Sequence, residues 1–250
     1  MRKFTKTMAA VLSLSMTLTM GTPVFAEETV ADTSNRVTTV VENLAVTPTP
    51  EPENNPPKTG FYKNGGKTYY YKNGKLVKGK YGYKIKNKYY HINKKGVVTT
   101  SSTAEKLAAI RLKKCGGNLK KAFTRSSTKI KYFGGVKKPR KGKNIVEYYA
   151  AYGFKYGRRD CYVMAATFCM MAKVKGFTNV KFVKGSVPQR NGKNGEHAWC
   201  EIKSGKTTYV YDPNFAHDYR NNPKAGSGYK FKYGDKGTYQ YNKERTKISF

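Results

Sequence analysis

A stretch without a single Tyr, Phe or Trp divides this chain and limits what the rest of it can fold into. The stretch covers residues 27–57 and ends in a run of Thr, Pro and Glu, and all 21 tyrosines lie after it. Such a segment cannot bury enough apolar surface to offset its ordering entropy, and its prolines favour an extended spacer. We therefore expect a disordered linker over 27–57, followed by one medium core with a small appendage.

The N-terminus has the pattern of an export signal. A positive start with Arg2 and Lys3 precedes a short apolar stretch, and residues 24–26 offer a small-x-small cleavage site. The stretch is too short for a membrane-spanning helix, which leaves a short buried helix as the alternative, and no later segment is apolar enough to span a bilayer. The sequence predicts a signal peptide over 1–26 and a secreted protein, extracellular or associated with the cell wall.

Positive charge is concentrated in residues 58–250, which hold 45 Lys and Arg against 9 Asp and Glu. Nucleic acid is one possible partner, because neutralising phosphates releases counterions. An exported protein does not meet intracellular nucleic acid, whereas anionic cell-wall polymers would supply the same electrostatic partner. A highly charged surface without a partner, or a module for extracellular nucleic acid, would also fit this composition.

Residues 58–100 contain a tyrosine-rich repeat. The pairs Tyr69-Tyr70 and Tyr89-Tyr90 lie 20 residues apart, and Asn-Gly pairs stand at 64–65 and 73–74. Asn-Gly pairs adopt positive φ in tight turns, so we expect short aromatic hairpins that stack on one another.

The repeat resembles the cell-wall-binding repeats of the choline-binding and glucan-binding kind, with Phe61 and Tyr81 where those repeats usually have Trp. The resemblance implies attachment to the wall, although the many lysines would repel a choline cation. Packing between hairpins is the other explanation for the tyrosines. The candidate ligand-binding aromatics are Tyr70, Tyr71, Tyr81 and Tyr90.

From residue 101 the pattern becomes helical. A capping box over 102–105 predicts a helix that ends at Gly116-Gly117, and 144–154 predicts a second helix. The Lys-, Ser- and Gly-rich residues 124–142 between them are expected to form a loop. Aromatic, basic residues over 229–241 predict one or two terminal strands.

A polar loop at 156–160 then runs directly into an apolar helix that begins near Cys161. In the first turn of a helix, the macrodipole and the unpaired N–H groups favour a thiolate. Arg158 and Arg159 act in the same direction, and Asp160 opposes them unless it caps the helix.

Two strands joined by a turn at Gly205 are expected to follow. Alternation places His197, Trp199 and Glu201 on one face of the first strand. The turn pairs position 197 with roughly position 212, so that Asp212 lies beside His197. A thiol, an imidazole and an orienting carboxylate then come within reach of one another.

These residues resemble the transglutaminase-like superfamily in their order and context: Gly157 before Cys161, then 197–199 (His-Ala-Trp), then 212–214 (Asp-Pro-Asn). The resemblance covers residues 150–216 and implies a papain-like α+β fold for 101–250, in which a nucleophile helix packs on an antiparallel sheet. It further implies that Cys161 is the nucleophile, that His197 takes the proton of Cys161 and later protonates the leaving amine, and that Asp212 orients the imidazole and stabilises its protonated form.

The function implied is acyl transfer on peptide or glutamine amides through a thioester at Cys161. If water resolves the thioester, the protein is a protease or amidase; if a lysine amine resolves it, the protein is a crosslinker. Bacterial members of the superfamily are commonly suspected hydrolases, so the resemblance favours hydrolysis. Alternatively, Cys161, His197 and Asp212 have only structural roles, and the chain is a non-catalytic wall-binding protein with a degenerate transglutaminase-like fold.

The remaining cysteines and histidines predict no metal site or cofactor. Cys115, Cys161, Cys169 and Cys200 could form two disulfides but lack a compact framework pattern, and no ligand spacing suits zinc. The pair at 217–218 (His-Asp) is expected in a surface loop.

Overall fold

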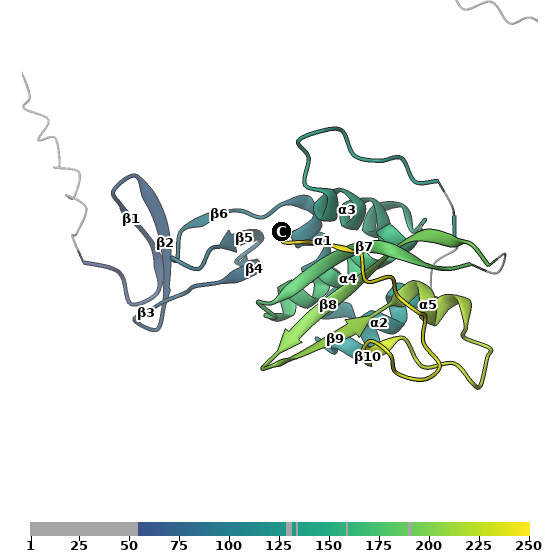
Figure 1. The fold of residues 1–250 in the computed structure, drawn as a ribbon. Coiled ribbons are helices and arrows are strands. Elements are labelled where there is room, and N and C mark those ends of the chain that lie inside the picture. The colour runs from purple at the N-terminus through teal and green to yellow at the C-terminus, as the bar shows by residue number, and fades with distance from the viewer. Residues whose placement is uncertain (1–54, 129–131, 134, 159, 190–191) are drawn as a thin grey trace, which may run out of the picture. The chain divides into compact units, whose positions relative to one another are not determined.

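The computed structural model describes residues 55–128, 132–133, 135–158, 160–189 and 192–250 (Figure 1). The expected signal peptide, all but the last residues of the expected linker, and Arg159 lie outside these residues. Helices are combined with antiparallel sheets, which is compatible with the expected α+β class. The elements are β1 (Gly60–Asn64), β2 (Lys67–Lys72), β3 (Lys75–Leu76), β4 (Lys80–Ile85), β5 (Lys88–Ile92), β6 (Val98–Thr100), α1 (Thr103–Lys114), α2 (Leu119–Thr128), α3 (Ile145–Tyr156), α4 (Cys161–Lys175), β7 (Val180–Pro188), β8 (Asn194–Ser204), β9 (Thr207–Tyr211), α5 (Pro213–Asp218), β10 (Tyr229–Phe231) and β11 (Thr246–Ile248).

The tyrosine-rich segment forms two antiparallel sheets, β1-β2-β3 and β4-β5-β6. The second turn uses Asn73 and Gly74, which have φ of 52° and 73°, as the Asn-Gly pattern predicts. At the first turn Asn64 still pairs with the neighbouring strand, so Gly65 and Gly66 supply the positive φ instead.

The rest of the chain combines the helices with a five-stranded antiparallel sheet of order β10-β9-β8-β7-β11. Helix α4 packs against β7 and β8 of this sheet (Figure 1). Ala198 and Cys200 of β8 face the main core together with the helices, while Trp199 belongs to a smaller cluster on the opposite face. This division confirms the alternation predicted for this strand. No helix among the described residues is long and apolar enough to cross a membrane.

Helix boundaries follow the capping signals. Ser102 caps α1 by accepting a hydrogen bond from the Glu105 N–H at 3.2 Å, and α3 begins after Asn144 and ends at Gly157 with φ of 66°. The loop expected over 124–142 is wrong at its start, because α2 extends to Thr128. The amphipathic α2 buries Ala122, Phe123, Ser126 and Ser127, a face in which hydroxyl groups hide the apolar periodicity.

The end of the chain also differs from expectation. The segment after Asp212 forms the short helix α5, which starts with a proline at a position where helices tolerate it. Of the aromatic tail, only Tyr229–Phe231 is a strand, and residues 238–241 pack by their side chains alone. The final strand β11, which was not expected, pairs with β7.

Gly153 sets the approach of α3 to α4. A Cβ at this position would lie 2.5 Å from Val163 Cγ1 and 2.7 Å from Thr167 Cγ2. We expect Gly153→Ala to lower the free energy of unfolding by about 1–3 kcal/mol because it overpacks this contact. Urea unfolding would measure the loss. Gly226→Ala, where a Cβ would meet no atom closer than 3.5 Å and the backbone has no positive φ, controls for the added methyl group; an equal loss in both variants would contradict close packing at Gly153.

Candidate active site

Cys161 is the first residue of α4, and its side chain is 8% exposed. Asp160 caps the helix by accepting a hydrogen bond from the Val163 N–H at 2.9 Å, so its carboxylate is engaged by the backbone, as the capping alternative required. Twelve of the fifteen residues of α4 are buried, which fixes the position of the thiol relative to the sheet.

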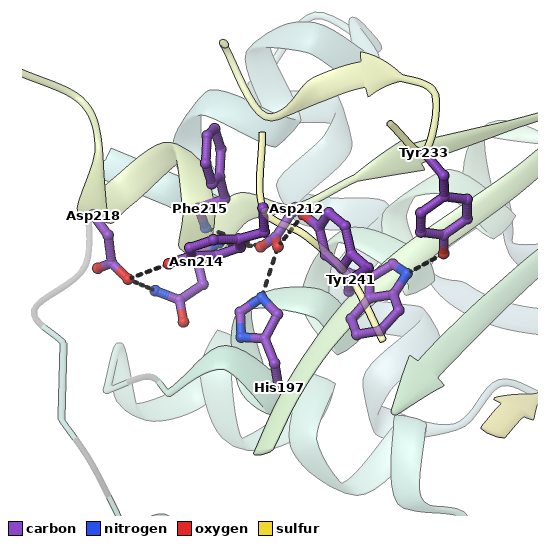
Figure 2. Close-up of polar contacts among 9 residues, drawn as sticks. His197, Asp212, Asn214, Phe215, Asp218, Tyr233 and Tyr241 are labelled. Carbon is purple, nitrogen blue, oxygen red and sulfur yellow. Dashed lines mark hydrogen bonds and ion pairs between the residues drawn. The ribbon is translucent and has the colours of Figure 1, made fainter. Parts of the chain in front are cut away.

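His197 and Asp212 meet on one face of the sheet. The β8–β9 register pairs Cys200 with Tyr211. Extending this register by one residue places Asp212 opposite Trp199 rather than opposite His197. The predicted pairing was therefore wrong by two residues. Because the error is even, Asp212 remains on the same face as His197, as its diagonal neighbour. His197 Nε2 lies 2.6 Å from Asp212 Oδ2 (Figure 2).

The Asp212 carboxylate is fully buried and accepts hydrogen bonds at both oxygens. Oδ1 accepts from the backbone N–H groups of Asn214 and Phe215, at 3.1 and 2.9 Å, which makes Asp212 the N-cap of α5. Oδ2 accepts from Tyr241 Oη–H at 2.7 Å in addition to the imidazole, so Asp212 lies between His197 and Tyr241 (Figure 2). Four donors thus stabilise one buried negative charge.

The surroundings of His197 favour its protonated form. Burial lowers the pKa of the imidazole, but the charge and hydrogen bond of Asp212, followed by those of Cys161, outweigh burial and raise the pKa from 6.5 to about 10. Trp199 stacks on the ring with centroids 5.9 Å apart, and Tyr239 meets it edge-on at 5.4 Å. Since Nε2 contacts Asp212, Nδ1 is the ring nitrogen that this contact does not occupy.

A pocket of about 440 Å³ opens at these groups. Cys161 and His197 both line it, together with two carboxylates, Glu196 and Asp218. The structure therefore places the three predicted site residues in one region: Asp212 contacts His197, and His197 and Cys161 line the same pocket. Asp218, expected at the surface, is exposed but also lines this pocket.

Sequence reasoning missed the tyrosines of the C-terminal segment. Besides the Tyr241 contact with Asp212, Tyr233 accepts a hydrogen bond from Trp199 Nε1 at 2.6 Å and donates one to Glu201 Oε1 at 2.5 Å. Glu201 also pairs with Lys247 Nζ at 2.6 Å. The predicted face shared by His197, Trp199 and Glu201 was the one available signal that polar partners were needed there.

The four candidate ligand-binding tyrosines lie in different surroundings in the structure. Tyr70 and Tyr90 each pack against Phe61, with centroids 5.1 and 5.3 Å apart, and line one pocket with it. Tyr71 instead meets the Tyr62 ring. Tyr81 lies edge-on to His91, and the Lys173 ammonium of α4 lies 4.7 Å from its ring, so Tyr81 contributes to packing between the hairpin segment and the helices.

Neither protein-family models nor curated proteins match this chain. Within the described residues, no group of three or more His, Cys, Asp or Glu side chains is placed to hold a metal ion. All four cysteines are free thiols and buried.

Tyr241→Phe tests the donor that sequence reasoning missed. Loss of a hydrogen bond to a buried carboxylate is expected to lower the free energy of unfolding by about 1.5–3 kcal/mol, while the ring contact with Trp199 remains. Urea unfolding is the measurement, and Tyr239→Phe is the matched control because its hydroxyl donates at 3.4 Å to the exposed Asp218. Equal losses in the two variants would contradict a special role for Tyr241.

The raised pKa of His197 also predicts a pH dependence. The folded protein holds this proton more tightly than the unfolded chain does, so the stabilisation is complete below about 6.5 and is lost as the pH rises toward about 10. We expect the free energy of unfolding of the wild type to fall over this window by more than that of His197→Gln. Parallel curves for the two proteins would contradict a charged His197.

Proposed function

We propose that this protein is a secreted cysteine enzyme with a papain-like, transglutaminase-like core that transfers acyl groups from peptide or glutamine amides through a thioester at Cys161. The observation that carries the proposal is the buried 2.6 Å contact between His197 and Asp212, at a pocket that Cys161 lines from the first turn of a helix. Any one of these features is common in a purely structural role, but their coincidence at a pocket is what nucleophilic catalysis needs.

In the proposed reaction, Cys161 Sγ attacks the carbonyl carbon of the amide after its proton has passed to His197. The backbone N–H of Cys161, at the start of the helix, is the proposed donor to the oxyanion. The imidazolium then protonates the leaving amine as the C–N bond breaks. Water, or a second amine, attacks the thioester and gives its proton to His197, which returns it to Sγ as the thiolate leaves. We favour water, and hence hydrolysis, as the second step.

The test uses an activated ester, because the natural substrate is unidentified. The enzyme should release a burst of one p-nitrophenolate per protein from p-nitrophenyl acetate, and mass spectrometry should find the acetyl group on Cys161. Cys161→Ala should abolish the burst. Cys169→Ala, a thiol on the same helix that faces the core, should retain it. No burst, or a burst that survives in Cys161→Ala, would leave the non-catalytic wall-binding protein as the better account.

We further propose that the hairpin segment attaches the enzyme to an anionic cell-wall polymer. A pocket of about 790 Å³ supports this proposal: Phe61, Tyr70, Tyr83 and Tyr90 offer ring surface there, and four exposed lysines surround the rings, namely Lys72, Lys84, Lys86 and Lys88. Rings bind the apolar faces of sugars or polyols, and ammonium groups bind the anionic substituents.

Co-sedimentation with purified Gram-positive cell walls tests attachment. Phe61→Ala and Lys86→Gln should each reduce the bound fraction, whereas Lys236→Gln, at an exposed position outside this pocket, should not. Competition by single-stranded DNA at equal charge concentration would point to a nucleic-acid module instead.

A further inference from the structure

The described lining of the pocket at Cys161 differs in its charged side chains from the other pockets of the protein. The whole chain carries a net charge of +34, and three other pockets each have four Lys or Arg side chains in their linings. The described lining of the Cys161 pocket contains no Lys or Arg, and it includes two of the nine carboxylates of residues 58–250, Glu196 and Asp218. In so basic a protein, this composition needs an explanation in terms of the ligand.

Neither Glu196 nor Asp218 forms a salt bridge with another of the described residues. Asp218 accepts hydrogen bonds from Asn214 Nδ2 at 2.9 Å and, more weakly, from Tyr239 Oη–H at 3.4 Å, and Glu196 accepts one from Tyr162 Oη–H at 3.3 Å. All three donors are neutral. Glu201, outside the pocket, shows the contrast, since Lys247 and Arg245 both pair with it.

The aromatic side chains of the pocket are a second feature, separate from the carboxylates, that favours a cationic ligand. Tyr132, Tyr219 and Tyr239 line it with the two carboxylates. Tyrosine rings attract cations through their faces, and in desolvated sites this attraction adds to that of carboxylates. An anionic ligand would meet two carboxylates that form no salt bridge with the described residues, whereas a cationic one would meet rings and carboxylates suited to it.

We propose that Glu196 and Asp218 bind a cationic group, a primary ammonium or a guanidinium, of the substrate beside the acyl group that Cys161 accepts. This inference rests on the proposed function, because it assigns the charge of the substrate at the same thiol. The cation belongs either to the acyl donor, as a side chain next to the amide, or to the acyl acceptor, as a second charged group beside the neutral amine that attacks the thioester.

Charged thiol reagents test the charge of the pocket without a known substrate. Methanethiosulfonates with a trimethylammonioethyl or a sulfonatoethyl group modify the same thiol. The ratio of their rates at Cys161, divided by the same ratio for free cysteine, removes the intrinsic reactivities of the thiol and of the two reagents. The net positive charge of the protein alone would favour the sulfonate. We expect the cationic reagent to react faster by about tenfold at low salt, because two carboxylates lie at the site.

The variants locate the effect. Glu196→Gln and Asp218→Asn should each lower the cation-to-anion rate ratio by about threefold, whereas Asp235→Asn, which removes an exposed carboxylate outside the pocket, should leave the ratio as in the wild type. A ratio below one in the wild type, or an equal change in all three variants, would overturn the inference. Failure of both reagents to react faster than with a free cysteine would instead overturn the proposed function.

Two further arms assign the cation to donor or acceptor. Glutamine peptides with an adjacent Lys or norleucine compare donors. For acceptors of the same thioester, 1,5-diaminopentane is compared with pentylamine, because the two share the reacting amine and only the first carries a second ammonium. A preference for the charged member in either arm supports the inference and names the source. Equal rates in both arms would contradict it even if the pocket prefers the cationic reagent.

Discussion

Asp212→Ala is expected to lower the free energy of unfolding by about 3–5 kcal/mol, the cost of breaking a buried ion pair at one partner. The variant removes the acceptor of four hydrogen bonds at once, from His197, Tyr241 and the first turn of α5. It would leave the imidazole buried without its counter-ion, at a residue that is 3% exposed. Urea unfolding near pH 7 would measure the loss.

Asp212→Asn separates stability from chemistry. Asparagine still accepts the hydrogen bonds at the start of α5, so the variant should fold even if Asp212→Ala does not. It cannot hold the imidazole in the same protonation state, and a change of this kind in a serine protease triad lowers kcat by about 10⁴-fold. We expect a stable protein with little ester burst. Asp235→Asn is the control, and a full burst in Asp212→Asn would remove Asp212 from the mechanism.

His197→Ala is expected to slow acylation by about 10³–10⁴-fold, because the thiol loses the group that accepts its proton. The measurement is the rate of the p-nitrophenolate burst at pH 7. His217→Ala is the matched control: its Nδ1 contacts the Ser127 carbonyl at 2.9 Å, and it does not line the Cys161 pocket. Equal slowing in both variants would contradict the assignment of His197 as the base.

The local part of this site could be predicted from the sequence. The start of α4 at Cys161 follows from a polar loop, a capping aspartate and an apolar run, all within a few residues. The side of the sheet that His197 occupies follows from alternation, which tolerates the two-residue error in the pairing of Asp212 because side chains repeat every two residues. Local order was therefore enough to place the three groups on the right elements.

Contacts made by irregular or distant segments could not be predicted in the same way. Tyr241 lies 29 residues after Asp212, in a stretch without regular structure, so no periodicity indicates which carboxylate it reaches. Tyr81 has the same local sequence context as the other repeat tyrosines, but its position beside α4 gives it Lys173 as a neighbour. The register and packing of separate elements decide such contacts, and a single sequence does not encode them in a readable pattern.

The most direct test of the account is the rate of iodoacetamide alkylation at Cys161 against pH, in the wild type and in His197→Ala, followed by mass spectrometry of the modified peptide. We predict that the rate near pH 6 is far higher in the wild type than in His197→Ala, because His197 is the proposed acceptor of the proton of the thiol. A wild-type rate that rises only near pH 8.5, where a free thiol ionises, and that is unchanged by His197→Ala would contradict it.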